Sequence, residues 1–137
     1  MAKSMRRCGR SLALLSAVIL PLAAQAQTAK ITGAVLRGLD KTTARITTFT
    51  APLGEPVKFG TLEVTVRDCR KHPPEDAPES AAYLDITESH PGDTAPRHWF
   101  SGWMFATSPA LSALEHPVYD LWVLDCSTAS GPSDKSG

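Results

Sequence analysis

The fold class of this chain is decided by one stretch, Val57-Lys58-Phe59-Gly60-Thr61-Leu62-Glu63-Val64-Thr65-Val66-Arg67. Apolar and polar residues alternate along it, which is the pattern of a β-strand with one face in the core. Gly60 interrupts the alternation, so we expect two strands here, at 57–59 and 62–68. Cys69 falls out of phase with the apolar face and needs a β-bulge or a strand end to turn inward.

Similar segments on either side predict five more strands, at 33–40, 44–51, 82–87, 99–106 and 118–126. A tight turn at 40–43 joins the first two, with an aspartate in the favoured first position. The last two segments are apolar on both faces. For 99–106 this leaves two alternatives, a central strand or a segment that partly forms a ligand-binding or partner-binding surface.

One short helix is expected near 109–116. Ser108 suits its N-cap, Pro109 its first position, and Pro117 ends it. The acidic, proline-rich stretch 72–80 is expected to be a loop. Six or seven short strands with a single helix predict an all-β fold, either a small β-sandwich or a barrel-like domain.

The first 26 residues have the three parts of a secretory signal peptide. Four basic residues open the chain, residues 12–24 form an apolar run, and Ala24-Gln25-Ala26 supplies small residues for cleavage. The run is shorter than the roughly 20 apolar residues that span a bilayer, and Pro21 interrupts it. We therefore expect a signal peptide at 1–26, a single β-rich domain at 27–126 and a disordered tail at 127–137. The mature protein is expected in the periplasm and not to span the membrane.

Charge argues against one class of partner. The chain carries 14 Lys and Arg against 14 Asp and Glu. Removal of residues 1–26 takes away four basic residues and no acidic one, which leaves 10 basic against 14 acidic residues, a net charge of −4. Because nucleic-acid binding domains carry an excess of positive charge, we expect no nucleic-acid partner.

The mature chain would contain two cysteines, Cys69 and Cys126. An even number of cysteines in an exported protein predicts a disulfide, because the compartment is oxidising. Two buried thiols are the alternative, since spacing along the chain does not establish bridging geometry.

The sequence contains no dinucleotide fingerprint, phosphate-binding loop, zinc-finger spacing or known catalytic-triad signature. Three of its four histidines, His72, His90 and His116, precede proline and are expected in turns at the surface. None has the spacing of a preformed metal site. We therefore assign no cofactor, no metal ligand and no catalytic residue.

The densest group of potential acids, bases and donors is Glu115, His116, Tyr119 and Asp120. An acid–base pair could be built from it, but no nucleophile or oxyanion motif accompanies it. Trp99, Trp103 and Trp122 are either core residues or exposed rings that stack on a ligand. The candidate binding surface consists of Trp99, Trp103 and Phe105 together with Glu115, His116, Tyr119 and Asp120.

Several motifs carry a family resemblance. They are Leu39-Asp40-Lys41, Phe59-Gly60, Cys69, Pro73-Pro74-Glu75, Gly102-Trp103-Met104-Phe105-Ala106, Ser108-Pro109-Ala110-Leu111, Ala113-Leu114-Glu115-His116-Pro117-Val118-Tyr119-Asp120 and Trp122-Val123-Leu124-Asp125-Cys126. The chain resembles an exported alphaproteobacterial family catalogued as domain of unknown function 2155. The resemblance implies a periplasmic single-domain protein in which both cysteines belong to the family pattern. It implies no activity.

The leading hypothesis is a non-catalytic periplasmic module that docks on an envelope protein or an inner-membrane complex. A small-molecule or glycan-binding β domain that uses exposed aromatic rings is the alternative. A hydrolase centred on Glu115, His116 and Asp120 is the third hypothesis.

Overall fold

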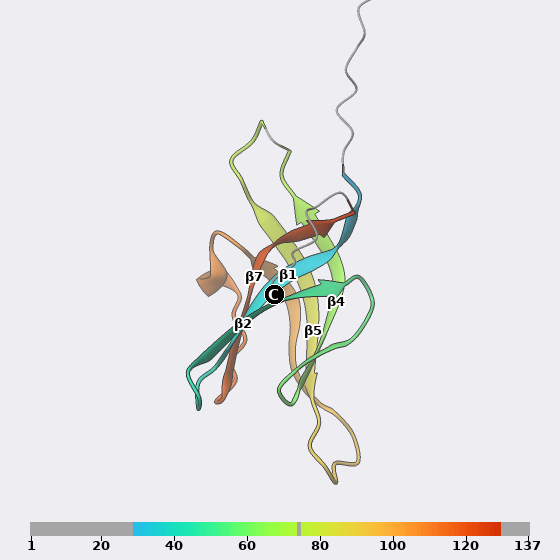
Figure 1. Cartoon of the computed structure of the whole chain (residues 1–137), viewed down its shortest axis with the longest axis vertical. Coiled ribbons are helices and arrows are strands. Elements are labelled where there is room, and N and C mark those ends of the chain that lie inside the picture. Colours follow the sequence, from blue (N-terminus) through green and yellow to red (C-terminus); the bar gives the residue numbers. More distant parts are fainter. Residues whose placement is uncertain (1–28, 74, 130–137) are drawn as a thin grey trace, which may run out of the picture.

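The structure, a computed structural model, describes residues 29–73 and 75–129 and contains seven strands (Figure 1). They are β1 (Ile31–Asp40), β2 (Arg45–Pro52), β3 (Val57–Phe59), β4 (Leu62–Lys71), β5 (Ser80–Glu88), β6 (Arg97–Phe105) and β7 (Tyr119–Thr128). The strands form two antiparallel sheets, in the order β2-β1-β7, here called sheet A, and β3-β4-β5-β6, here called sheet B. The predicted all-β fold is confirmed, and of its two forms the structure is a sandwich of two separate sheets.

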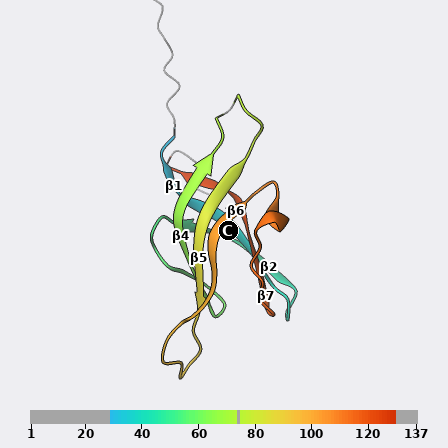
Figure 2. The ribbon, with the colours of Figure 1, turned by 180° about the vertical axis from the view of Figure 1, so that it is seen from behind.

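The core lies between the two sheets. Its fully buried large side chains come from alternate positions of the strands: Leu36, Leu62, Val64, Val66, Leu84, Ile86, Met104 and Val123. The alternation in the sequence therefore reports the inner face of each sheet. Figure 2 shows sheet B in front of sheet A, with β6 at its edge. Of the two alternatives for 99–106, a central strand is thus wrong, because β6 pairs only with β5.

Several strands extend beyond their predicted boundaries, because backbone pairing continues past the apolar side chains. Ile31 pairs with Thr128, so the polar segments at both ends of the domain join sheet A. Ser127 and Thr128 therefore belong to β7 and not to the predicted disordered tail; residues 130–137 of that tail, like the predicted signal peptide at 1–26, lie outside the described residues. Ser80 begins β5 and does not end the preceding loop.

The predicted helix at 109–116 is wrong. Only a single 3-10 turn forms, η1 (Pro109–Leu111), and the Ser108 side chain makes no capping hydrogen bond. Leu114 and His116 are both buried, and residues two apart do not share a helix face, so an extended segment buries both where a helix could not. No helix among the described residues is long and apolar enough to cross a membrane.

Two β-bulges place the cysteines. In β4 the pair Val66–Leu84 is followed by Asp68–Tyr83, which leaves Arg67 as an extra residue and turns Cys69 inward. The expected bulge before Cys69 is therefore present. In β7 the neighbouring pairs Leu36–Val123 and Val35–Asp125 leave Leu124 as the extra residue, so Cys126 also faces the interior.

Candidate functional site

Three side chains donate hydrogen bonds to one buried carboxylate, that of Glu88, at the end of the sandwich where β5 ends. The name Glu88 cluster is used here for Glu88, its donors Thr61, Trp99 and His116, and Tyr119, whose ring lies against the His116 ring. Glu88 lies on the inner face of β5 and is only 6% exposed. Its Oε1 accepts a hydrogen bond from the Thr61 hydroxyl at 2.6 Å. Its Oε2 accepts hydrogen bonds from Trp99 Nε1 at 2.8 Å and from His116 Nε2 at 3.1 Å.

His116 is held as one tautomer. Its Nδ1 lies 3.0 Å from the Val118 amide nitrogen and 3.2 Å from the Tyr119 amide nitrogen, both of which are donors. Nδ1 must therefore be the acceptor, and the ring proton sits on Nε2, which donates to Glu88. Both ring nitrogens are therefore hydrogen-bonded, Nδ1 to the start of β7 in sheet A and Nε2 to the end of β5 in sheet B. His116 thus links the two sheets.

The electrostatics of Glu88 follow from these contacts. Burial raises the pKa of Glu88, but the hydrogen bonds from Thr61, His116 and Trp99 together outweigh burial and lower the pKa to about 2. The carboxylate is therefore ionised and well solvated by protein donors. A group with so low a pKa is a weak proton acceptor, which favours a structural role for the pair.

A third bulge brings Trp99 into the cluster. The pair Ile86–Phe100 is followed by Thr87–His98, so Trp99 has no partner in β5 and turns inward. Its ring lies 4.3 Å from the His116 ring between centroids, and the Arg97 guanidinium covers it at 4.4 Å. Ring contacts continue from His116 through Tyr119 and Phe59 to Phe49 in β2.

The predicted candidate surface is not one surface. His116 and Tyr119 are buried, and Trp99 is partly buried with them. Asp120 lies on the outer face of sheet A and pairs with Lys41 at 2.9 Å, while Glu115 is exposed. The trio Glu115, His116 and Asp120 is therefore not brought together.

Trp103 and Phe105 lie on the outer face of sheet B, opposite Tyr83 and Ala81. The edge of the Tyr83 ring meets the Trp103 ring at 5.6 Å, and Arg70 lies 5.5 Å over it. Trp103 is thus partly covered by its neighbours, which makes it a poor flat platform for a sugar ring.

The sequence analysis missed a hydrogen-bonded group of polar side chains on this outer face, formed by Arg67, Asp85, Ser101 and His98. Asp85 accepts hydrogen bonds from Ser101 Oγ and from Arg67 Nε, and His98 Nε2 lies 2.7 Å from Ser101 Oγ. The Ser101 and Arg67 hydrogen bonds lower the pKa of Asp85. Serine, histidine and aspartate recur in catalytic triads, where the serine hydroxyl donates its proton to the histidine. Here the Ser101 hydroxyl donates to Asp85 instead, so the hydrogen bond that activates a serine nucleophile is absent.

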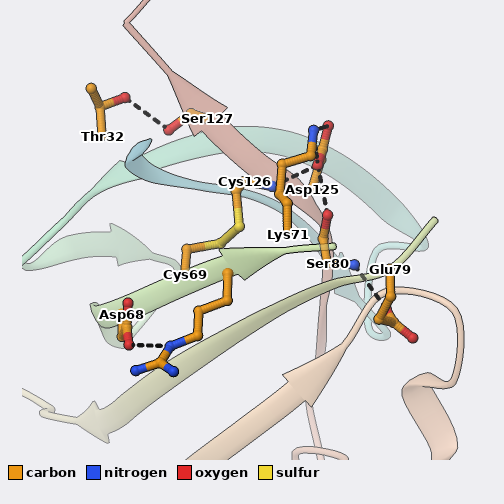
Figure 3. The surroundings of a disulfide bond; sticks show 10 residues. Thr32, Asp68, Cys69, Lys71, Glu79, Ser80, Asp125, Cys126 and Ser127 are labelled. Carbon is orange, nitrogen blue, oxygen red and sulfur yellow. Dashed lines mark hydrogen bonds and ion pairs between the residues drawn. A yellow bond between two sulfur atoms is a disulfide. The ribbon is translucent and has the colours of Figure 1, made fainter. Parts of the chain in front are cut away.

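The disulfide predicted between Cys69 and Cys126 joins the two sheets at the opposite end, with their α-carbons 5.8 Å apart (Figure 3). Beside it, Asp125 accepts hydrogen bonds from Lys71 and from the Ser80 hydroxyl. Burial raises the pKa of Asp125, but hydrogen bonds from Lys71, Ser80 and the Cys126 amide lower it overall. Ser80 and Glu88 are the first and last inner positions of β5, so polar contacts join the sheets at both ends of this strand.

An apolar groove of about 410 Å³ lies between the 3-10 turn and β7. It is lined by Pro109, Ala110, Ala113, Leu114, Asp120, Leu121 and Trp122. Leu111, in the same turn, is 76% exposed. Among the described residues, no three His, Cys, Asp or Glu side chains are placed to hold a metal ion.

Comparisons with known proteins place this chain among proteins of unassigned activity. A family model described as "Uncharacterized protein conserved in bacteria (DUF2155)" matches residues 34–126. A protein of Rickettsia prowazekii (strain Madrid E), described as uncharacterized protein RP359, is 32% identical over 88 residues. The match covers 64% of this chain and 56% of the relative, so the chain spans little more than half of the relative's length. The comparison with solved structures found no match.

Proposed function

We propose that this chain, which belongs to the DUF2155 family of conserved bacterial proteins, is a non-catalytic periplasmic module that docks on an envelope protein or an inner-membrane complex. The observation that carries the proposal is the cross-sheet disulfide, because such bonds persist in oxidising compartments outside the cytoplasm. The secretory features of residues 1–26 point to the same compartment.

The buried polar groups support a binding role. The polar atoms of Glu88 and His116 are used in holding the two sheets together. The group of polar side chains on sheet B is open to solvent, and its serine proton is directed to Asp85. Active sites usually place reactive groups with available polar atoms in a concave pocket. The polar atoms of Glu88 and His116 are already paired with each other and with other donors, and the polar residues on sheet B are exposed.

The groove beside β7 is the docking surface that we propose. It is mostly apolar, it includes Trp122, and the exposed Leu111 belongs to the same 3-10 turn as the lining residues Pro109 and Ala110. Exposed apolar surface of this kind is typical of protein–protein contacts, and tryptophan is enriched among the residues that dominate their affinity. A partner with an apolar ridge would displace water from the groove.

Export can be tested first. The protein is expected in the periplasmic fraction with an intact mass that corresponds to a chain starting at or near Gln27. Recovery of a chain that retains residues 1–26 would contradict the export step.

Docking can be tested with a photo-crosslinking amino acid at Ala113, which lines the groove, and at Glu63 on the outer face of sheet B as a control. We expect one cross-linked product of defined mass from Ala113 and none from Glu63. Leu111→Asp should abolish that product, while Ile46→Asp, at a residue 60% exposed elsewhere, should leave it unchanged. The same products from both probe positions, or no effect of Leu111→Asp, would refute this docking surface.

A further inference from the structure

A small pocket of about 250 Å³ lies beside the Glu88 cluster, between β2 and β3. These two strands are edge strands, one in each sheet, and Tyr119 at the start of β7 reaches the same pocket. The pocket therefore opens where the sandwich is not closed by a neighbouring strand.

The inner face of β2 changes character along its length. Phe49 and Ala51 pack into the core, whereas Thr47 and Arg45, the preceding inner positions, are exposed and line the pocket. Inner positions of a sandwich strand are normally apolar. Polar side chains at these two positions indicate that this part of β2 faces a polar ligand or solvent and not a core.

Arg45 and Asp40, two charged residues at inner positions, border the pocket. Arg45 is the cross-strand partner of Asp40, but no ion pair forms between them. Asp40 Oδ1 instead accepts hydrogen bonds from the Thr42 and Thr43 amides of the turn. Lys58 is the cross-strand partner of Glu63, again without an ion pair between the two. Lys58 also lines the pocket, but it starts from the outer face of sheet B, so the inner wall carries one cation, Arg45, and one anion, Asp40.

Tyr119 supplies a second donor. It lines the pocket and is 9% exposed. Its hydroxyl accepts the Thr61 amide at 3.4 Å, and none of the described residues accepts a hydrogen bond from it. The hydroxyl lies directly against Gly60, another lining residue, where an added Cβ would be 2.3 Å away. The phenol proton is therefore left available at the wall of the pocket.

We propose that this pocket binds an oxyanion group, a phosphate or a carboxylate, through the Arg45 guanidinium and the Tyr119 hydroxyl. Arginine binds both groups with paired hydrogen bonds, and a hydroxyl donor beside it adds direction. The Phe59 ring, which also lines the pocket, provides an apolar wall for the carbon atom next to the anion. The volume suits a small molecule or the headgroup of a lipid. This assignment does not depend on the docking groove, which lies beside β7 on the other edge of sheet A.

The test uses the mature protein labelled with ¹⁵N and three probes at constant ionic strength: inorganic phosphate, glycerol 3-phosphate and phosphatidylglycerol vesicles, with phosphatidylcholine vesicles as the neutral control. We expect saturable shifts confined to the Gly60 and Thr47 amides and the Arg45 Nε–H. Arg45→Gln and Tyr119→Phe should each weaken binding about tenfold or more. Arg37→Gln, on the outer face of sheet A, should leave it unchanged.

The probes separate the possible sources of the oxyanion. Saturation by either soluble phosphate supports a free ligand, and binding to phosphatidylglycerol vesicles alone supports a headgroup. Shifts spread over all basic residues, or equal affinity in Arg45→Gln and the unmodified protein, would overturn the proposal. Tyr119→Phe keeps the ring, and its unfolding curve shows whether a lost signal reflects lost binding or lost fold.

Discussion

Cys69 and Cys126 each stand one residue out of phase with the apolar positions of their own strand, and a β-bulge turns each of them toward the other. In β4 the apolar positions are even-numbered up to Val66, and in β7 they are odd-numbered up to Val123. The bulge in β4 also keeps Asp68 and Arg70 off the inner face. The sandwich is therefore joined at one end by a covalent bond and at the other by the Glu88 cluster.

Loss of the disulfide should be costly. Cys69→Ser or Cys126→Ser is expected to lower the free energy of unfolding by about 2–5 kcal/mol, because the bond closes a loop of 57 residues whose chain-entropy contribution is about 4 kcal/mol. The double variant should be no less stable than either single variant, since all three lack the same bond. Denaturant unfolding measures both effects. Two reactive thiols in the native exported protein would contradict the bond itself.

Glu88→Gln should lower the free energy of unfolding by about 1–3 kcal/mol. Donors from Thr61, Trp99 and His116 converge on the carboxylate, and the amide group of glutamine would face them with two further N–H donors. Urea unfolding gives the difference. Glu115→Gln, at an exposed glutamate, is the matched control and should change stability by less than about 0.5 kcal/mol. Equal effects of the two substitutions would show that the Glu88 cluster contributes nothing specific.

Features of the fold that depend on neighbouring residues could be predicted from the sequence, whereas contacts between residues far apart in the sequence could not. Alternation along the chain predicts the strands, and continuing it from Ala82, Leu84 and Ile86 would have placed Glu88 on the inner face. Its partner His116 is 28 residues away in the other half of the fold, and no local pattern specifies that contact. The helix prediction failed for the same reason: Ser108-Pro109 is a sound local start signal, but burial of Leu114 and His116 between the sheets outweighs it.

The Glu88 cluster also predicts acid sensitivity. The pKa of Glu88 is about 2 in the folded protein and 4.5 ordinarily, so the unfolded chain binds more protons between these values. The stability that Glu88 contributes is therefore complete above about pH 4.5 and is lost as the pH falls toward 2. Free energies of unfolding from about pH 6 to about pH 2.5 should fall less steeply in Glu88→Gln than in the unmodified protein. Other carboxylates with lowered pKa values, such as Asp85 and Asp125, remain in both proteins. Identical slopes would contradict this prediction.

Gly60 should tolerate no side chain. Its φ is +59°, and an added Cβ would lie 2.3 Å from the Tyr119 hydroxyl oxygen and 2.5 Å from the ring carbon that bears it. Gly54 offers a matched control, because its φ of +76° imposes a similar backbone strain while no atom lies within 4 Å of an added Cβ. Both Gly60→Ala and Gly54→Ala are expected to be destabilised by the backbone strain, but Gly60→Ala by a further 1–3 kcal/mol or so, because the Tyr119 ring is packed against Phe59 and His116 and has little room to move. Urea unfolding of the two variants gives the difference directly. If the two substitutions are equally destabilising, Tyr119 does not lie against Gly60 in solution, and the donor that we assign to the oxyanion pocket is not where the structure has it.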